Sequence, residues 1–231
     1  MAIGKNSPVI KRASFILLAV LASLVGVYPV IYFIIDRRFG LLNSKSETLL
    51  ESSIWNISFY THIMLGGVAL SIGWTQFVSK WRKQNPKVHR QIGKVYVFTV
   101  LLSAITSIYI ALFATGGIVP SVGFICMGVV WFFTTFKAYL DIRNKKILSH
   151  QRMMIYSYAT CLAAVTLRIY LPIFISVFND FNKAYAVVSW LSWVPNLIVA
   201  YFIIQHLYPN QITVSNNQFE VIATNSSRQK I

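Results

Sequence analysis

The chain has 231 residues, of which 56% are hydrophobic and only 12% are charged. A soluble domain carries about 25% charged residues, so this composition excludes a water-soluble protein and predicts an integral membrane protein. The net charge of +15 comes from basic residues that lie in short runs between apolar stretches. That placement predicts the lipid bilayer, with its anionic head groups, as the partner and argues against nucleic acid.

Six apolar stretches are each long enough to cross a hydrocarbon core, which takes about 20 helical residues. In chain order they cover residues 14–35, 54–79, 95–115, 118–139, 153–178 and 184–205. The alternation that would mark a membrane barrel is absent. The sequence therefore predicts an all-α polytopic bundle of six transmembrane helices in one domain, residues 1–208, with spans two to five as its core. A polar tail, residues 209–231, is expected to be disordered.

Lysine and arginine set the expected orientation. The segments between spans two and three and between spans four and five are strongly basic, whereas the turns after spans three and five are not. Basic loops stay on the cytoplasmic side. Both termini are therefore predicted to be cytoplasmic, in a multi-pass protein of the plasma membrane.

Spans two to three and four to five are a possible duplicated helical hairpin. Aligning His89 on His150 also places Thr99 on Thr160. Each copy then has an aromatic span end, a basic loop, a histidine beside the membrane and a further span. Because both hairpins would start on the same side, the copies would be parallel repeats.

The same segments carry a family resemblance. The stretches HIMLGGVALSIGWTQF, HRQIGKVYV and SHQRMMIYSYATCLAAVTLRIYLP resemble the bacterial predicted-membrane-protein family called domain of unknown function 2306, over roughly residues 62–172. The resemblance implies several helical spans. It implies no activity.

Two ionisable residues, His62 and Arg168, fall well inside predicted spans, away from the basic span ends, where such residues are costly unless they have partners. At 1.5 Å per residue, His62 and Arg168 both lie about 25 Å from the cytoplasmic face, so they could line one polar pocket in the outer half of the bilayer. Candidate neighbours at that depth are Tyr109, Tyr170, Thr166, Thr61 and Ser107. No acidic residue falls within a predicted span, so a bound anion could serve as the counter-ion of Arg168. Two alternatives stay open: Arg168 could instead reach the outer interface and Asp180, and His62 could be a packing residue.

His89 and His150 precede spans three and five on the cytoplasmic side and could together ligate a haem. The alternative is a basic loop that faces lipid head groups. No cysteine and histidine spacing typical of a metal site occurs, so no metal is expected. Catalytic motifs such as GxSxG and HExxH are also absent, which leaves enzyme status uncertain.

Three functions therefore remain in view. The protein could be a non-catalytic assembly or scaffold protein with an unknown protein partner, a haem-binding electron-transfer protein that uses His89 and His150, or a transporter or receptor for a small anionic or lipid-like ligand held by His62 and Arg168. Pro195 in span six is expected to kink that helix, and Asn196 can satisfy a backbone group that the kink frees.

Overall fold

The computed structural model describes residues 8–35 and 40–209, and within them the chain is helical without any strand. Six helical stretches are long and apolar enough to cross a membrane, which confirms the predicted all-α polytopic bundle. They are Arg12–Phe33, Ser53–Phe77, Pro86–Ala111, Ile118–Arg143, Ile147–Phe178 and Phe181–Leu207. The predicted polar tail lies outside the described residues, except for its first position.

The first three spans combine long helices with short 3-10 turns and linking helices. They consist of α1 (Pro8–Val27) with η1 (Tyr28–Phe33), α3 (Ser53–Gly73) with η3 (Trp74–Phe77), and α5 (Pro86–Ala111). Between the first two lie η2 (Gly40–Ser44) and α2 (Glu47–Glu51), and α4 (Ser79–Gln84) joins the second to the third. Ser52 caps α3, because its hydroxyl accepts from the Trp55 N–H at 3.4 Å.

The last three spans differ from one another in continuity. Span four is one helix, α6 (Ile118–Arg143), whereas span five divides into α7 (Ile147–Cys161) and α8 (Ala163–Phe178) and span six into α9 (Phe181–Leu191) and α10 (Val194–Leu207). The kink expected at Pro195 is present as the α9–α10 break, with the proline in the first turn of α10, where its missing N–H removes no helix hydrogen bond.

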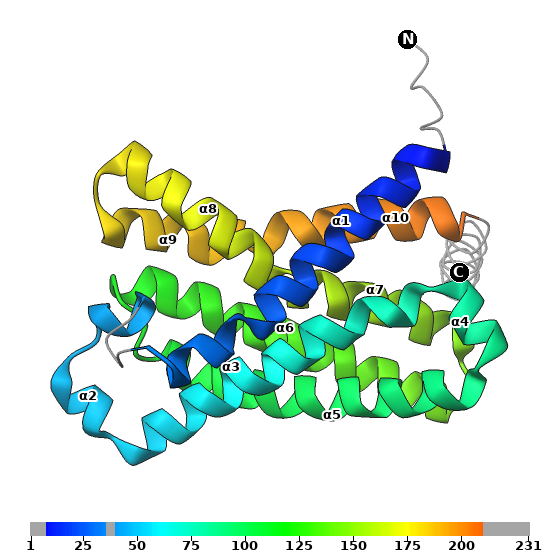
Figure 1. Cartoon of the computed structure of the whole chain (residues 1–231), viewed down its shortest axis with the longest axis horizontal. Helices are drawn as coiled ribbons and strands as arrows, with labels where there is room; N and C mark the ends of the chain where they lie inside the picture. The colour runs from blue at the N-terminus through cyan, green and yellow to red at the C-terminus, as the bar shows by residue number, and fades with distance from the viewer. Residues whose placement is uncertain (1–7, 36–39, 210–231) are drawn as a thin grey trace, which may run out of the picture.

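Figure 1 places the start of α1, the α4 linker and the end of α10 at one end of the bundle, which we call the basic end. At the opposite end lie η2, α2 and the turn between α8 and α9. This grouping puts the lysine- and arginine-rich α4 linker beside both ends of the described chain, as the predicted topology requires.

The core is formed mainly by α3, α5, α6 and α7, as predicted. Its buried side chains include Leu70, Tyr96, Val100, Trp131 and Tyr158. The outer helices pack on this core, α1 against α3, α9 against α6 and α10 against α7. A Cβ on Gly67 would lie 2.4 Å from the carbonyl oxygen of Gly26, so the contact of α1 with α3 requires glycine, as close helix packing in membranes commonly does.

Several span ends differ from the prediction because helices continue past the apolar stretches. The third span begins at Pro86 rather than 95 and the fifth at Ile147 rather than 153, so both candidate haem histidines lie inside helices. The fourth continues to Arg143, which brings Asp141 into α6. The prediction that no acidic residue falls within a span is therefore wrong. Hydropathy marks the apolar part of each span, whereas the helical hydrogen bonds continue into the polar residues that flank it.

Candidate functional site

A cavity of about 510 Å³ lies toward the end opposite the basic end. Residues of α1, η1, η2, α3 and all the helices from α5 to α9 line it, and most of them are apolar or aromatic. This volume lies within the range of small-molecule sites, about 300–1,000 Å³. His62 and Arg168, which the sequence places at one depth, both line this cavity.

Ser103 on the neighbouring α5 fixes the ring of His62. The His62 Nδ1 lies 3.1 Å from the Ser103 carbonyl oxygen and 3.0 Å from its hydroxyl. That hydroxyl donates its proton to the His62 carbonyl at 2.9 Å, so Nδ1 must carry the proton that these contacts need. In the neutral ring this hydrogen-bond pattern assigns Nε2 as an acceptor.

Arg168 is held on α8 by two contacts that keep its charge inside the bundle. Its guanidinium carbon lies 4.7 Å from the centroid of the Tyr28 ring, and its Nη1 donates to the Ala164 carbonyl at 2.8 Å. Ala164 is one turn nearer the basic end, so the side chain points away from the outer interface. Asp180 caps α9 and pairs with Lys183 at 4.0 Å. Among the described residues, Arg168 therefore does not form the ion pair with Asp180 that the snorkelling alternative requires.

A second cation, Lys45, lines the same cavity and was not singled out from the sequence. Its ammonium donates to the carbonyl oxygen of Phe113 and, at 3.0 Å, to the hydroxyl of Thr115. These bonds fasten the segment after η2 to the turn between α5 and α6. Burial lowers the pKa of Lys45 to about 8, because a low dielectric disfavours the charged form. A lysine in a loop gives no sequence signal that it will fold over a cavity.

The cavity wall also holds a polar group without a partner. Trp55 is 2% exposed and lines the cavity. Its indole Nε1 is buried without a hydrogen-bond partner among the described residues. A buried donor left unpaired costs about 1–3 kcal/mol, but this nitrogen exposes less than 1 Å² of surface and so does not face the cavity.

The described residues provide no carboxylate to neutralise the two cations. Neither Arg168 nor Lys45 forms an ion pair within the described chain, and no aspartate or glutamate is among the described residues that line the cavity. The described portion of the site is therefore cationic, with hydrogen-bond donors set in apolar walls.

The other predicted neighbours differ in their places. Ser107 lines the cavity, whereas Tyr109, Tyr170, Thr166 and Thr61 do not. Tyr109 packs edge-on against Phe113, and Tyr170 against Phe174. The Thr166 hydroxyl instead donates to the Ser192 carbonyl at the break between α9 and α10. These residues were predicted near the cavity from their depth alone, but the rotation of each helix directs their side chains away from it.

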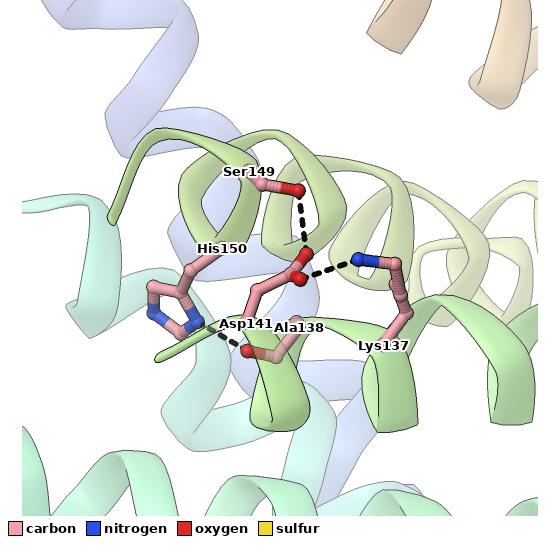
Figure 2. Close-up of polar contacts among 5 residues, drawn as sticks. All are labelled: Lys137, Ala138, Asp141, Ser149 and His150. Carbon is pink, nitrogen blue, oxygen red and sulfur yellow. Dashed lines mark hydrogen bonds and ion pairs between the residues drawn. The ribbon is translucent and has the colours of Figure 1, made fainter. Parts of the chain in front are cut away.

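The two candidate haem ligands lie at the basic end, each as the fourth residue of its helix. His89 lines a separate pocket of about 150 Å³, to which His150 does not contribute. Figure 2 shows His150 bonded through Nδ1 to the Ala138 carbonyl at 2.8 Å. No group of three or more potential metal ligands occurs in the described part of the chain.

Asp141 lies beside His150 and joins the end of α6 to the start of α7. It is 2% exposed, forms an ion pair with Lys137 and accepts from the Ser149 hydroxyl at 2.5 Å (Figure 2). This carboxylate is at the basic end, so it has no part in neutralising Arg168.

No curated protein and no solved structure matches the chain. A family model described as Predicted membrane protein (DUF2306) matches residues 59–204. This range is more than half of the chain, and it includes both His62 and Arg168. The chain belongs to this family of membrane proteins, DUF2306.

Proposed function

We propose that the protein binds a small amphipathic anion, with a carboxylate or phosphate head and an apolar body, in the cavity of His62, Arg168 and Lys45. We place it in the plasma membrane with the basic end toward the cytoplasm, so that the cavity lies in the outer half of the bilayer. There the protein would act as a receptor or a transporter for this ligand.

One observation carries the proposal: two cations share an apolar cavity whose described lining has no carboxylate. An arginine at the centre of a membrane helix costs about 2.5–3.5 kcal/mol, and its guanidinium cannot deprotonate in practice. The Tyr28 ring and one carbonyl meet part of this requirement. An anionic group beside Arg168 in the same cavity as Lys45 would meet the rest.

The lining assigns a role to each polar group. Arg168 can donate two parallel hydrogen bonds to one carboxylate or phosphate, while Lys45 adds a point charge. The neutral His62 ring can accept from a hydroxyl of the ligand. The aromatic walls would hold the apolar body, which makes an inorganic anion a poor fit.

The experiment compares three C12 probes on the purified protein: dodecyl phosphate, dodecanoate and uncharged dodecanol. We expect the two anions to bind and dodecanol to bind at least about tenfold more weakly, because loss of a buried charge partner costs about 2–5 kcal/mol. Arg168→Gln should remove the preference for anions. Equal binding of all three probes to the native protein would overturn the proposal.

A matched control for this variant is Arg143→Gln. Arg143 also lies over a tyrosine ring, at 6.0 Å from the Tyr139 centroid, but it is exposed at the basic end. This change should leave the binding of all three probes as it is. If it weakened anion binding as much as Arg168→Gln, the effect would come from net charge rather than from the cavity.

The haem hypothesis for His89 and His150 stays a prediction. The equivalent positions of the two histidines favour it, since bis-imidazole ligation takes one residue from each of two facing helices. The visible spectrum of protein from haem-replete cells, oxidised and reduced, tests it. A Soret band lost in His150→Ala would support it, and a colourless folded protein would count against it.

A further inference from the structure

A second hollow, of about 150 Å³, lies where α4 meets the start of α5 at the basic end. Its polar lining comes from Thr75 and Gln76 of η3, Arg82 of α4, and Asn85 and His89 at the start of α5. The hollow is too small for a whole cofactor, since sites of that kind measure about 300–1,000 Å³. It has room for a single head group.

The charges around this hollow have one sign. Residues 79–94 contain six lysines and arginines and no acidic residue. Among these basic side chains only Arg82 is half-buried, and the other five are exposed. Arg82 is therefore the basic residue of this segment that lies in the pocket, together with His89, which is half-buried as well.

Two amides in the pocket have unused hydrogen-bonding capacity. Gln76 is 8% exposed, and the hydrogen bond found for its Nε2 is a long one of 3.3 Å to the neighbouring Thr75 hydroxyl. Asn85 stands at the N-cap of α5, yet its side chain makes no capping bond. These amides can serve a ligand at the positive end of the α5 dipole.

Aromatic residues fix the depth of the pocket. Trp81 lines it and is 50% exposed, and its ring packs on Trp74 at 5.9 Å between centroids. Half-exposed tryptophans of this kind lie at the membrane interface. Val88 and Ile92 line the pocket, and Val95, one turn further along α5, is exposed on the apolar surface. An acyl chain could follow this stripe from the pocket into the bilayer.

We propose that the hollow at α4 and α5 binds the phosphate of an anionic phospholipid, with Arg82 and His89 on the phosphate and an acyl chain along Val88, Ile92 and Val95. This inference is independent of the proposed function of the outer cavity. It concerns the opposite end of the bundle and shares no residue with that site.

The test measures lipid retained on the full-length protein by native mass spectrometry, in detergent with added dioleoyl phosphatidylglycerol or dioleoyl phosphatidylcholine. We expect one phosphatidylglycerol to be retained in preference to phosphatidylcholine, and Arg82→Gln to reduce its occupancy at least fivefold. The matched control is Lys83→Gln, which removes the same charge from the next residue of α4 but from an exposed side chain outside the pocket. That control should retain phosphatidylglycerol as the native protein does.

Glycerol 3-phosphate, the soluble head group alone, identifies the source of the phosphate. If it displaces phosphatidylglycerol at equal concentration, the pocket is a site for free phosphate esters, and the lipid assignment is overturned. If Lys83→Gln lowers occupancy as much as Arg82→Gln, the attraction is a property of the whole basic surface, and the site itself is overturned. Thermal unfolding of both variants shows whether each is folded when lipid is lost.

Discussion

The hydroxyl of Tyr96 on α5 lies 2.9 Å from the hydroxyl of Ser157 on α7, and both side chains are completely buried. The two positions are also equivalent in the hairpin alignment, since each stands seven residues after its histidine, His89 or His150. Contact between equivalent residues is expected where a symmetry axis passes between two copies. The bond therefore supports the duplicated hairpin, which stays a prediction of the sequence.

Replacement of Ser157 by alanine tests this contact. Ser157 also lies 2.7 Å from the Thr135 hydroxyl, so the change leaves a buried tyrosine hydroxyl without its partner. We expect a loss of about 1 kcal/mol in the free energy of unfolding, since hydrogen bonds inside membranes average about 0.6 kcal/mol and an unpaired group adds to this. Thermal unfolding in detergent measures it. Ser176→Ala removes an exposed hydroxyl and should change stability little.

The amide of Asn196 joins the two helix breaks. It donates to the Ala159 carbonyl at 3.2 Å and to the Ser192 carbonyl at 3.0 Å, so it satisfies acceptors beside the α7–α8 and α9–α10 breaks. Asn196→Leu should cost about 1–3 kcal/mol in stability, because both carbonyls would lose this donor in the membrane. Asn182→Leu, on an exposed part of α9, is the control. An equal melting temperature for the two variants would contradict the role given to Asn196.

The proposed binding of an anion should depend on pH through Lys45. Its pKa of about 8 means that the ammonium is charged at pH 7 and neutral above pH 9. The affinity for dodecyl phosphate should therefore fall as the pH rises through 8, a range in which Arg168 keeps its charge. Isothermal titration at pH 7 and 9.5 measures the change. Lys45→Gln should bind more weakly at pH 7 and lose most of this dependence, whereas an unaltered dependence would remove Lys45 from the site.

The same shift affects the empty protein in the opposite direction. An unfolded lysine has its pKa near 10.5, so between pH 8 and 10.5 the unfolded state binds more protons than the folded state. Stability without ligand should accordingly rise with pH across this window through Lys45. Comparison with Lys45→Gln in the same buffers isolates that contribution, which is absent if the variant and the native protein show parallel curves.

Asp141 should matter for stability but not for the outer cavity. Asp141→Ala leaves the Ser149 hydroxyl without its acceptor and Lys137 without its charge partner, although the half-exposed lysine can turn to water. We expect a loss of about 1–2 kcal/mol in the free energy of unfolding. The affinity for dodecyl phosphate should be the same as in the native protein at a temperature where both are folded. A weaker affinity would show that the two ends of the bundle are coupled.

Hydropathy was sufficient to predict six spans, and the geometry of the helices placed His62 and Arg168 at one depth. Both line one cavity, because the rise of a helix is regular even across the break at Leu162. Depth alone does not place Tyr109 and Tyr170, because the direction of each side chain depends on the rotation of its helix. Lys45 could not be predicted, since its position depends on how a loop folds over the bundle. Asp141 was not placed in a span because α6 extends beyond the apolar stretch from which the fourth span was predicted.

The breaks in spans five and six lie next to each other, as the Thr166–Ser192 contact shows. Between them α8 and α9 form a hairpin that carries Arg168 and Tyr185 on one wall of the cavity. The opposite wall belongs to the long helices of the core. The backbone torsions at Leu162 and at Ser192–Trp193 therefore set the distance between the two walls. These two helix breaks therefore determine the size of molecule that the cavity admits. The first break lies about ten residues or fewer from Arg168, and the second lies about as far from Tyr185.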